Sequence, residues 1–132
     1  MTVFFDTSAV VALHIETAGR KVAVEALADG TCVSALALTE ALALIPRLTD
    51  EAVLQADLED AVRLQWDRYA VVPLDQRCLD RAAQLMRDQP LRLADARHLA
   101  AAERLPRPVT FVTFDPPQIP VALGLGFDVV SS

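Results

Sequence analysis

The sequence predicts an α/β fold with a mainly parallel central sheet. Short runs rich in β-branched and aromatic residues alternate along the chain with longer segments whose apolar residues recur at the helical period. No repeat, low-complexity tract or linker interrupts this alternation, and a length of 132 residues suits one domain spanning residues 1–132. A hydrophobic fraction of 53% argues against an intrinsically disordered chain.

The first elements are a strand and two helices. Residues 2–5 form a β-branched and aromatic run, which is typical of a strand. The polar residues 6–8 that follow can cap a helix beginning in the apolar segment 9–13. Residues 17–28 alternate apolar and charged positions and predict an amphipathic helix ending at Gly30.

The middle of the chain predicts one buried strand and two helices. Cys32 and Val33 indicate the strand. A helix then begins at Ser34 or Ala35 and is ended by Pro46 or Thr49. Between residues 50 and 69 charged and apolar residues alternate with helical rhythm, which predicts a further helix.

The C-terminal half repeats the pattern of strand and helix. Residues 70–74 predict a strand, Asp75 caps a helix that runs through Met86, and residues 93–105 form another helix. The most β-like segment of the chain is 109–114, and residues 127–130 predict a strand at the edge of the sheet.

Four carboxylates stand in surroundings that are otherwise apolar: Asp6, Glu40, Asp95 and Asp115. Burying an ionised carboxylate without a partner is costly, so acids in such surroundings are expected to be paired, protonated or bound to a metal ion. Asp6 and Asp115 directly follow predicted strands, and ligands of open parallel sheets bind beyond the carboxyl ends of the strands. Glu40 and Asp95 project from helices. Because carboxylate oxygens suit Mg²⁺ or Mn²⁺, the pattern indicates metal-assisted hydrolysis of a phosphate ester.

The net charge of −6 disfavours a protein that coats nucleic acid without regard to sequence. Eleven of the twelve basic residues are nevertheless arginine, the side chain best matched to phosphate. Four of them surround the Asp95 segment, namely Arg92, Arg97, Arg104 and Arg107. The charge pattern therefore permits a metal-dependent site that acts on a phosphate-containing substrate.

Other features favour a cytoplasmic protein without a membrane segment. No uncharged apolar run reaches the ~20 residues that a membrane helix needs. The N-terminal segment has no positive charge before its apolar residues, unlike a signal peptide. Cys32 and Cys78 do not have the spacing of metal ligands and are expected to be buried thiols.

Four segments, VFFDTSAVVAL, VSALALTEAL, LRLADARHLAAA and VTFVTFD, resemble in their order and spacing the PIN-domain nucleases, specifically VapC-type toxins of bacterial toxin–antitoxin pairs. The resemblance covers nearly the whole chain. It implies a PIN-like three-layer α/β/α sandwich in which Asp6, Glu40, Asp95 and Asp115 surround Mg²⁺ or Mn²⁺. Ser8 and Thr113 match hydroxyl positions that support the site.

The resemblance also implies an endoribonuclease that cleaves cellular RNA and is inhibited by a cognate VapB-like antitoxin. Homodimers are expected, and promoter DNA is bound only through the antitoxin. Arg92 is a candidate for holding the acid cluster or the RNA. Arg97 stands where the family more usually has leucine, and is expected to pair with Asp95 or to contact an RNA phosphate.

One departure from the family concerns the segment after Asp115. The family continues there into a helix. Asp115 can cap one helical turn that begins with Pro116, but Pro120 is expected to block its continuation. The ion would rest on three carboxylates if Asp115 lies elsewhere. Each acid also has a structural alternative: Asp6 as a helix cap, Glu40 as the partner of Arg92, Asp95 as a first-turn acid, and Asp115 as a turn residue.

Two other functions remain open. An aspartate-nucleophile phosphatase would use Asp6 to attack phosphorus, but that chemistry normally needs a second acid two residues later, where this chain has Ser8. A catalytically silent PIN-like module would only bind a partner. His98 is expected to be a packed or hydrogen-bonded residue rather than a catalytic base.

Overall fold

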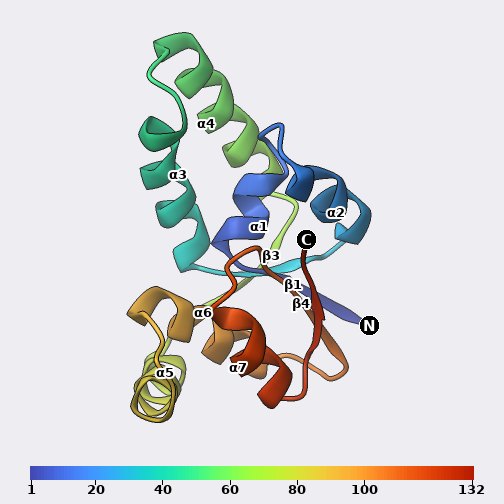
Figure 1. The fold of residues 1–132 in the computed structure, drawn as a ribbon, viewed down its shortest axis with the longest axis vertical. Coiled ribbons are helices and arrows are strands. Elements are labelled where there is room, and N and C mark those ends of the chain that lie inside the picture. The colour runs from blue at the N-terminus through green and yellow to red at the C-terminus, as the bar shows by residue number, and fades with distance from the viewer.

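The computed structural model describes all 132 residues and contains one five-stranded sheet (Figure 1). All four strand pairs are parallel, and the strand order is β3-β2-β1-β4-β5. The strands are β1 (Thr2–Phe5), β2 (Cys32–Ser34), β3 (Ala70–Val72), β4 (Val109–Val112) and β5 (Asp128–Val130). The predicted parallel sheet is confirmed, and β5 lies at its edge as expected.

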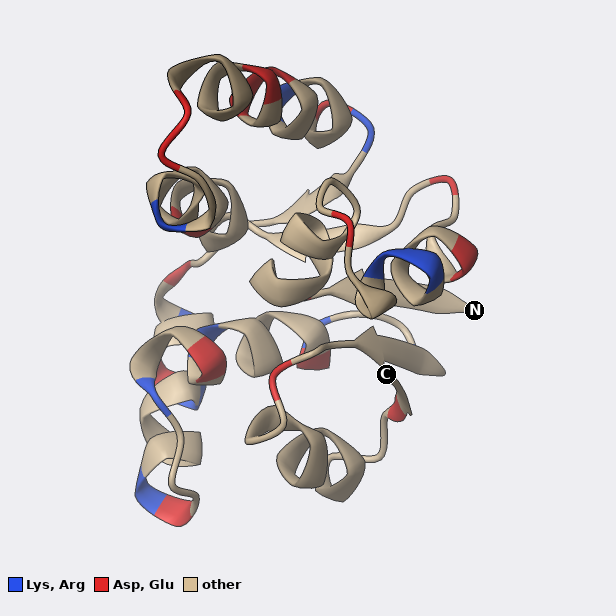
Figure 2. Cartoon of the chain, turned by 45° about the horizontal axis from the view of Figure 1, so that its top comes forward, with Lys and Arg blue, Asp and Glu red and all other residues tan.

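Seven helices surround the sheet. They are α1 (Thr7–Ala12), α2 (Ala18–Ala26), α3 (Leu36–Leu48), α4 (Ala52–Trp66), α5 (Gln76–Asp88), α6 (Leu93–Glu103) and α7 (Gln118–Gly124). None of them is both long enough and apolar enough to cross a lipid bilayer. Strands β1 to β4 contain no charged residue, and the charged side chains lie on helices and loops around them (Figure 2).

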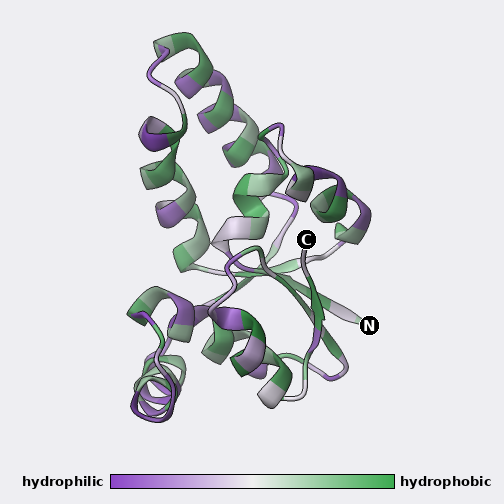
Figure 3. Ribbon diagram, in the orientation of Figure 1, coloured by the Kyte–Doolittle hydropathy of each residue, from purple (hydrophilic) through white to green (hydrophobic).

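The helices form two layers, one on each face of the sheet. Successive side chains of a strand point to opposite faces, so Phe4 packs into one core and Phe5 into the other. The core on the Phe4 side includes residues of α5, α6 and α7, and the core on the Phe5 side includes residues of α1 to α4. Figure 1 shows the two groups of helices above and below the sheet, and Figure 3 shows their apolar residues. The arrangement is a three-layer α/β/α sandwich.

Helix α7 runs past Pro120 to Gly124 and so contradicts the prediction that Pro120 would block the continuation of a helix after Asp115. Pro120 is the third residue of α7, within the first turn. A backbone N–H in the first turn has no acceptor inside the helix, so a proline there removes no helical hydrogen bond. Asp115 and Pro116 begin the turn, since their carbonyl groups accept hydrogen bonds from the N–H groups of Gln118 and Ile119.

The topology fixes where a site can form. After β1 the chain adds β2 and β3 on one side, and β4 and β5 then add to the other side of β1. The direction of strand addition therefore reverses between β1 and β4, and the connections leaving these two strands diverge beyond their carboxyl ends. Such a switch point is where open α/β sheets bind ligands. Asp6 follows β1 there, and Asp115 lies three residues after the end of β4.

Candidate functional site

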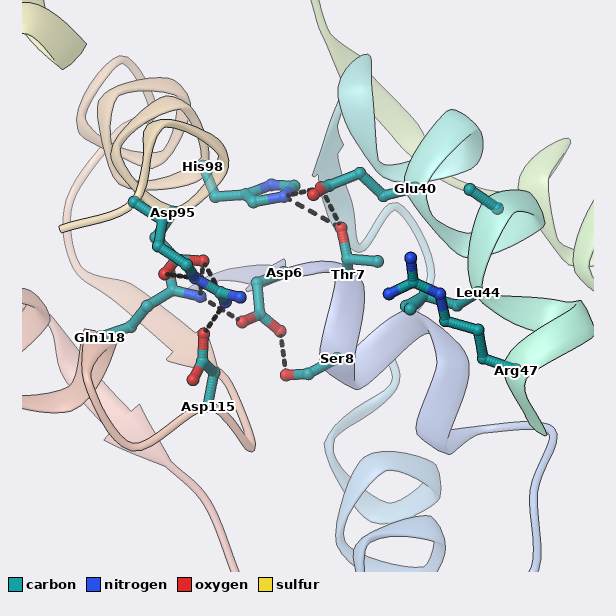
Figure 4. A pocket seen from close by; sticks show the side chains of 12 residues that line it. Asp6, Thr7, Ser8, Glu40, Leu44, Arg47, Asp95, His98, Asp115 and Gln118 are labelled. Atoms are coloured by element: carbon teal, nitrogen blue, oxygen red, sulfur yellow. Dashed lines mark hydrogen bonds and ion pairs between the residues drawn. The ribbon is translucent and has the colours of Figure 1, made fainter.

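A cavity of about 270 Å³ opens at this switch point (Figure 4). All four predicted acids line it, although they come from four different parts of the chain: Asp6, Glu40, Asp95 and Asp115. Ser8 and Arg92 line it as well. Asp115 lies in the loop between β4 and α7, and its carboxylate accepts a hydrogen bond from Arg92 at the cavity.

Asp6 is the most deeply held of the four. Its side chain is buried, and its Oδ1 accepts hydrogen bonds from the Ala9 N–H at 3.0 Å and the Ser8 hydroxyl at 2.6 Å. Its Oδ2 accepts from the Thr113 hydroxyl at 2.6 Å and from Nε2 of Gln118 at 2.7 Å. Asp6 therefore caps α1, as one alternative expected, and at the same time presents its carboxylate to the cavity.

Two donors join Asp6, Asp95 and Asp115 into one cluster, which we call the acid cluster. Nε2 of Gln118 donates to Asp6 and also to Oδ1 of Asp95, at 3.2 Å. Arg92 donates from Nε to Oδ2 of Asp95 at 3.0 Å and from a terminal nitrogen to Oδ2 of Asp115 at 2.7 Å. Asp95 is buried in the first turn of α6, whereas the Arg92 side chain at the rim is 74% exposed.

Glu40 lies across the cavity from the acid cluster, on α3. Its Oε1 accepts hydrogen bonds from the Thr7 hydroxyl and from Nε2 of His98, both at 2.6 Å. The other ring nitrogen of His98 lies 3.1 Å from the Ser34 hydroxyl, so the buried ring is fixed on both sides. The partner of Glu40 is thus His98 rather than the arginine that the structural alternative named.

The carboxylates differ in electrostatic environment. Burial raises the pKa of Asp6 although Ser8 and Thr113 donate to it. Burial also raises the pKa of Asp95, against the opposing effect of Arg92. Burial acts in the same direction on Glu40, but hydrogen bonds from His98 and Thr7 outweigh it and hold the pKa of Glu40 below its ordinary value. The negative charge of Asp6 and Asp95 is thus incompletely compensated, which favours binding of an added cation.

The donor set fits a hard divalent cation. No three acidic, histidine or cysteine side chains are close enough together to enclose an ion by themselves. Mg²⁺ keeps several of its waters and is usually held by one or two carboxylates. Asp6 and Asp95 form such a pair, with the Gln118 amide between them and a buried Oε1 on that amide that has no partner. The Arg92 guanidinium and the neutral Gln118 amide donate hydrogen bonds to the carboxylates with which a cation would interact.

Sequence reasoning missed several residues of the cavity. Gln118 lies in the segment where at most one helical turn is expected. Its one available signal in the sequence is that it stands three residues after Asp115, at a position from which a side chain can reach back toward the start of a helix. The sequence indicates Thr7 only as a capping residue and gives no signal for Arg47, yet both line the cavity. Arg97, in contrast, does not line the cavity and does not pair with Asp95, because residues two apart on a helix face different directions.

Comparison with known proteins agrees with this architecture. The PIN domain family model matches residues 3–118 of the chain. The chain belongs to the PIN-domain family. No curated protein matches this PIN-domain chain at the level of sequence.

Solved structures with the same fold come from toxin–antitoxin systems. A toxin–antitoxin complex from Klebsiella pneumoniae matches with a TM-score of 0.73 at 20% identity, covering 98% of this chain and 96% of that one. VapC20 of Mycobacterium tuberculosis, a toxin that cleaves the sarcin–ricin loop, gives 0.70 at 19% identity over 91% and 95%. VapBC2 of Rickettsia felis, bound to a promoter DNA fragment, gives 0.72 at 12% identity over 100% and 99%. At these identities the likeness establishes the fold.

Proposed function

We propose that this PIN-domain protein is a divalent-metal-dependent endoribonuclease and the toxin of a VapBC-type toxin–antitoxin pair. The observation that carries the proposal is the acid cluster. Asp6, Asp95 and Asp115 are brought together at the switch point of a PIN fold, with Glu40 on the facing wall. Four carboxylates in one cavity repel one another and any RNA phosphate unless a cation is present, which supports a metal-dependent reaction.

Mg²⁺ or Mn²⁺ bound there would lower the pKa of a water molecule and stabilise the oxygen that leaves phosphorus. Asp6 and Asp95 would hold the ion, with Asp115 and Glu40 acting through water. Ser8 and Thr113 fix the orientation of the Asp6 carboxylate. His98 and Thr7 do the same for Glu40. Arg92 at the rim can leave the carboxylates when the ion neutralises them and can then bind the phosphate that is cleaved.

The proposed protein partner is an antitoxin, and the similar structures and the net charge of the chain support it. The similar structures include toxin–antitoxin complexes, one of them bound to promoter DNA. We therefore propose a VapB-like antitoxin that covers the cavity and so prevents RNA from entering. A chain with net charge −6 is poorly suited to DNA, so promoter binding would fall to the antitoxin. A homodimer acting on cellular RNA in the cytoplasm completes the proposal.

The test is cleavage of single-stranded RNA by the purified protein in Mg²⁺ or Mn²⁺. Asp6→Asn and Asp95→Asn should each abolish cleavage, and a chelator should abolish it in the wild type. Asp128→Asn is the matched control, because Asp128 is exposed on the edge strand β5. Cleavage that persists in both cavity variants with chelator present would exclude the proposal.

The two alternative functions predict different outcomes of the same assay. An aspartate-nucleophile phosphatase would hydrolyse a generic phosphomonoester and leave RNA intact. The environment of Asp6 does not favour that chemistry, because the residue two positions later is Ser8, which donates a hydrogen bond to Asp6 and cannot serve as the second acid. A silent partner-binding module would bind its antitoxin and cleave neither substrate.

A further inference from the structure

Arg47 is the second of the two basic residues that line the cavity, and it has no partner within the chain. It lies on the same face of α3 as Glu40, because residues seven apart are two helical turns apart, and Leu44 lies on that face between them. Figure 4 shows the Arg47 side chain extending from α3 toward Thr7. The other basic residue, Arg92, is held by Asp95 and Asp115.

The two basic residues of the cavity lie on opposite sides of it. Arg47 stands on the α3 wall, whereas Arg92 is held within the acid cluster on the facing side by Asp95 and Asp115. Glu40, the acid nearest to Arg47 along α3, already accepts hydrogen bonds from Thr7 and His98. The Arg47 guanidinium thus remains free to bind an anion that enters from solvent. Its planar array of donors matches the oxygens of a phosphodiester.

We propose that Arg47 binds a backbone phosphate of the RNA next to the one that is cleaved, so that the strand crosses the cavity from α3 to α6. The inference rests on the proposed ribonuclease function and adds a substrate-binding subsite to it. Arg47 would then bind one phosphate, while the acid cluster with its metal ion and Arg92 would bind the neighbouring phosphate that is cleaved.

The experiment measures binding of a fluorescently labelled single-stranded oligoribonucleotide by anisotropy, in Ca²⁺ and at several salt concentrations, with the oligonucleotide checked afterwards for integrity. Arg47→Gln should weaken binding about tenfold. It should also reduce the slope of log K against log salt by about 0.7, the value for one lost phosphate contact on a single strand. Arg47→Lys, which keeps the charge, should retain the wild-type slope.

Arg68→Gln is the matched control. Arg68 is exposed and makes no ion pair. It lies just before β3, at the amino ends of the parallel strands, whereas the cavity lies beyond their carboxyl ends. The Arg68→Gln variant should bind the oligoribonucleotide as tightly as the wild type does. The melting temperatures of all variants establish that they are folded.

The outcomes separate this inference from the function on which it rests. If the wild type cleaves RNA and Arg47→Gln binds RNA with unchanged affinity and salt slope, the inference is wrong and the ribonuclease proposal stands. If Arg47→Gln instead loses affinity for the antitoxin alone, Arg47 belongs to the partner interface and the inference is again wrong. If the wild type neither binds nor cleaves RNA, both proposals fail.

Discussion

Replacing Arg92 by glutamine tests whether this arginine occupies the place of a cation. The side chain donates to the buried Asp95 and to Asp115, yet it is itself 74% exposed. An exposed arginine is screened by water, so its contacts should contribute about 1 kcal/mol to the free energy of unfolding of the metal-free protein. A loss of that size lowers the melting temperature of a domain of this length by about 4 °C.

The same loss should strengthen metal binding. Since the contacts of Arg92 with Asp95 and Asp115 compete with an ion at these carboxylates, the free energy that they contribute opposes binding. Removing about 1 kcal/mol of competition raises the affinity about fivefold. At a saturating concentration of Mg²⁺ the variant and the wild type should therefore unfold at nearly the same temperature.

Thermal unfolding in chelator and in a Mg²⁺ series, together with calorimetric titration of Mn²⁺, measures both effects. Arg68→Gln serves as the control, since it removes an arginine far from the cavity. A variant that is destabilised equally with and without the ion, and binds Mn²⁺ no more tightly than the wild type, would refute the competition between Arg92 and the cation.

Three further predictions concern the surroundings of the site. Gln118→Leu removes the donor shared by Asp6 and Asp95 and should cost about 2 kcal/mol of unfolding free energy in chelator, with partial recovery in Mg²⁺; no recovery would argue against a cation at this pair. Burial lowers the pKa of His14, whose Nε2 has no partner, so the wild type should lose stability as the pH falls through about 6.5, the unfolded value. His14→Leu should not show this loss in urea unfolding at pH 7.5 and 5.5, and equal pH dependence in both proteins would contradict the assignment. Phe111→Ala should cost about 3–5 kcal/mol in urea unfolding, because the buried ring stacks on Phe4 and Phe127, and a cost below about 1 kcal/mol would contradict this packing.

The fold was predictable because its signals are local and repeated. Each strand is a short apolar run, and every predicted helix shows a cap or a helical apolar period. The error at α7 came from treating Pro120 as a helix breaker without knowing where the helix begins. That position depends on the turn made by Asp115 and Pro116, which the sequence pattern does not reveal.

The acids of the cavity could be identified from the sequence because each is an exception within an apolar run. Thr7, Gln118 and Arg47 give no such signal: a polar residue in a polar segment is ordinary, and its importance depends on what lies across the cavity. Gln118 matters because it contacts Asp6, 112 residues earlier in the chain. Such a contact arises from the sheet order, which becomes known only with the structure.

The acid cluster lies between the two cores. Asp6 caps α1, which packs in the core containing Phe5, whereas Asp95 lies on α6, which packs in the core containing Phe4. A single amide, that of Gln118, joins the two carboxylates across the carboxyl edge of the sheet. A divalent ion held by the same pair would connect the helical layers on both faces directly. Under the proposed function, ion binding and the contact between the two layers would therefore depend on the same few carboxylate oxygens.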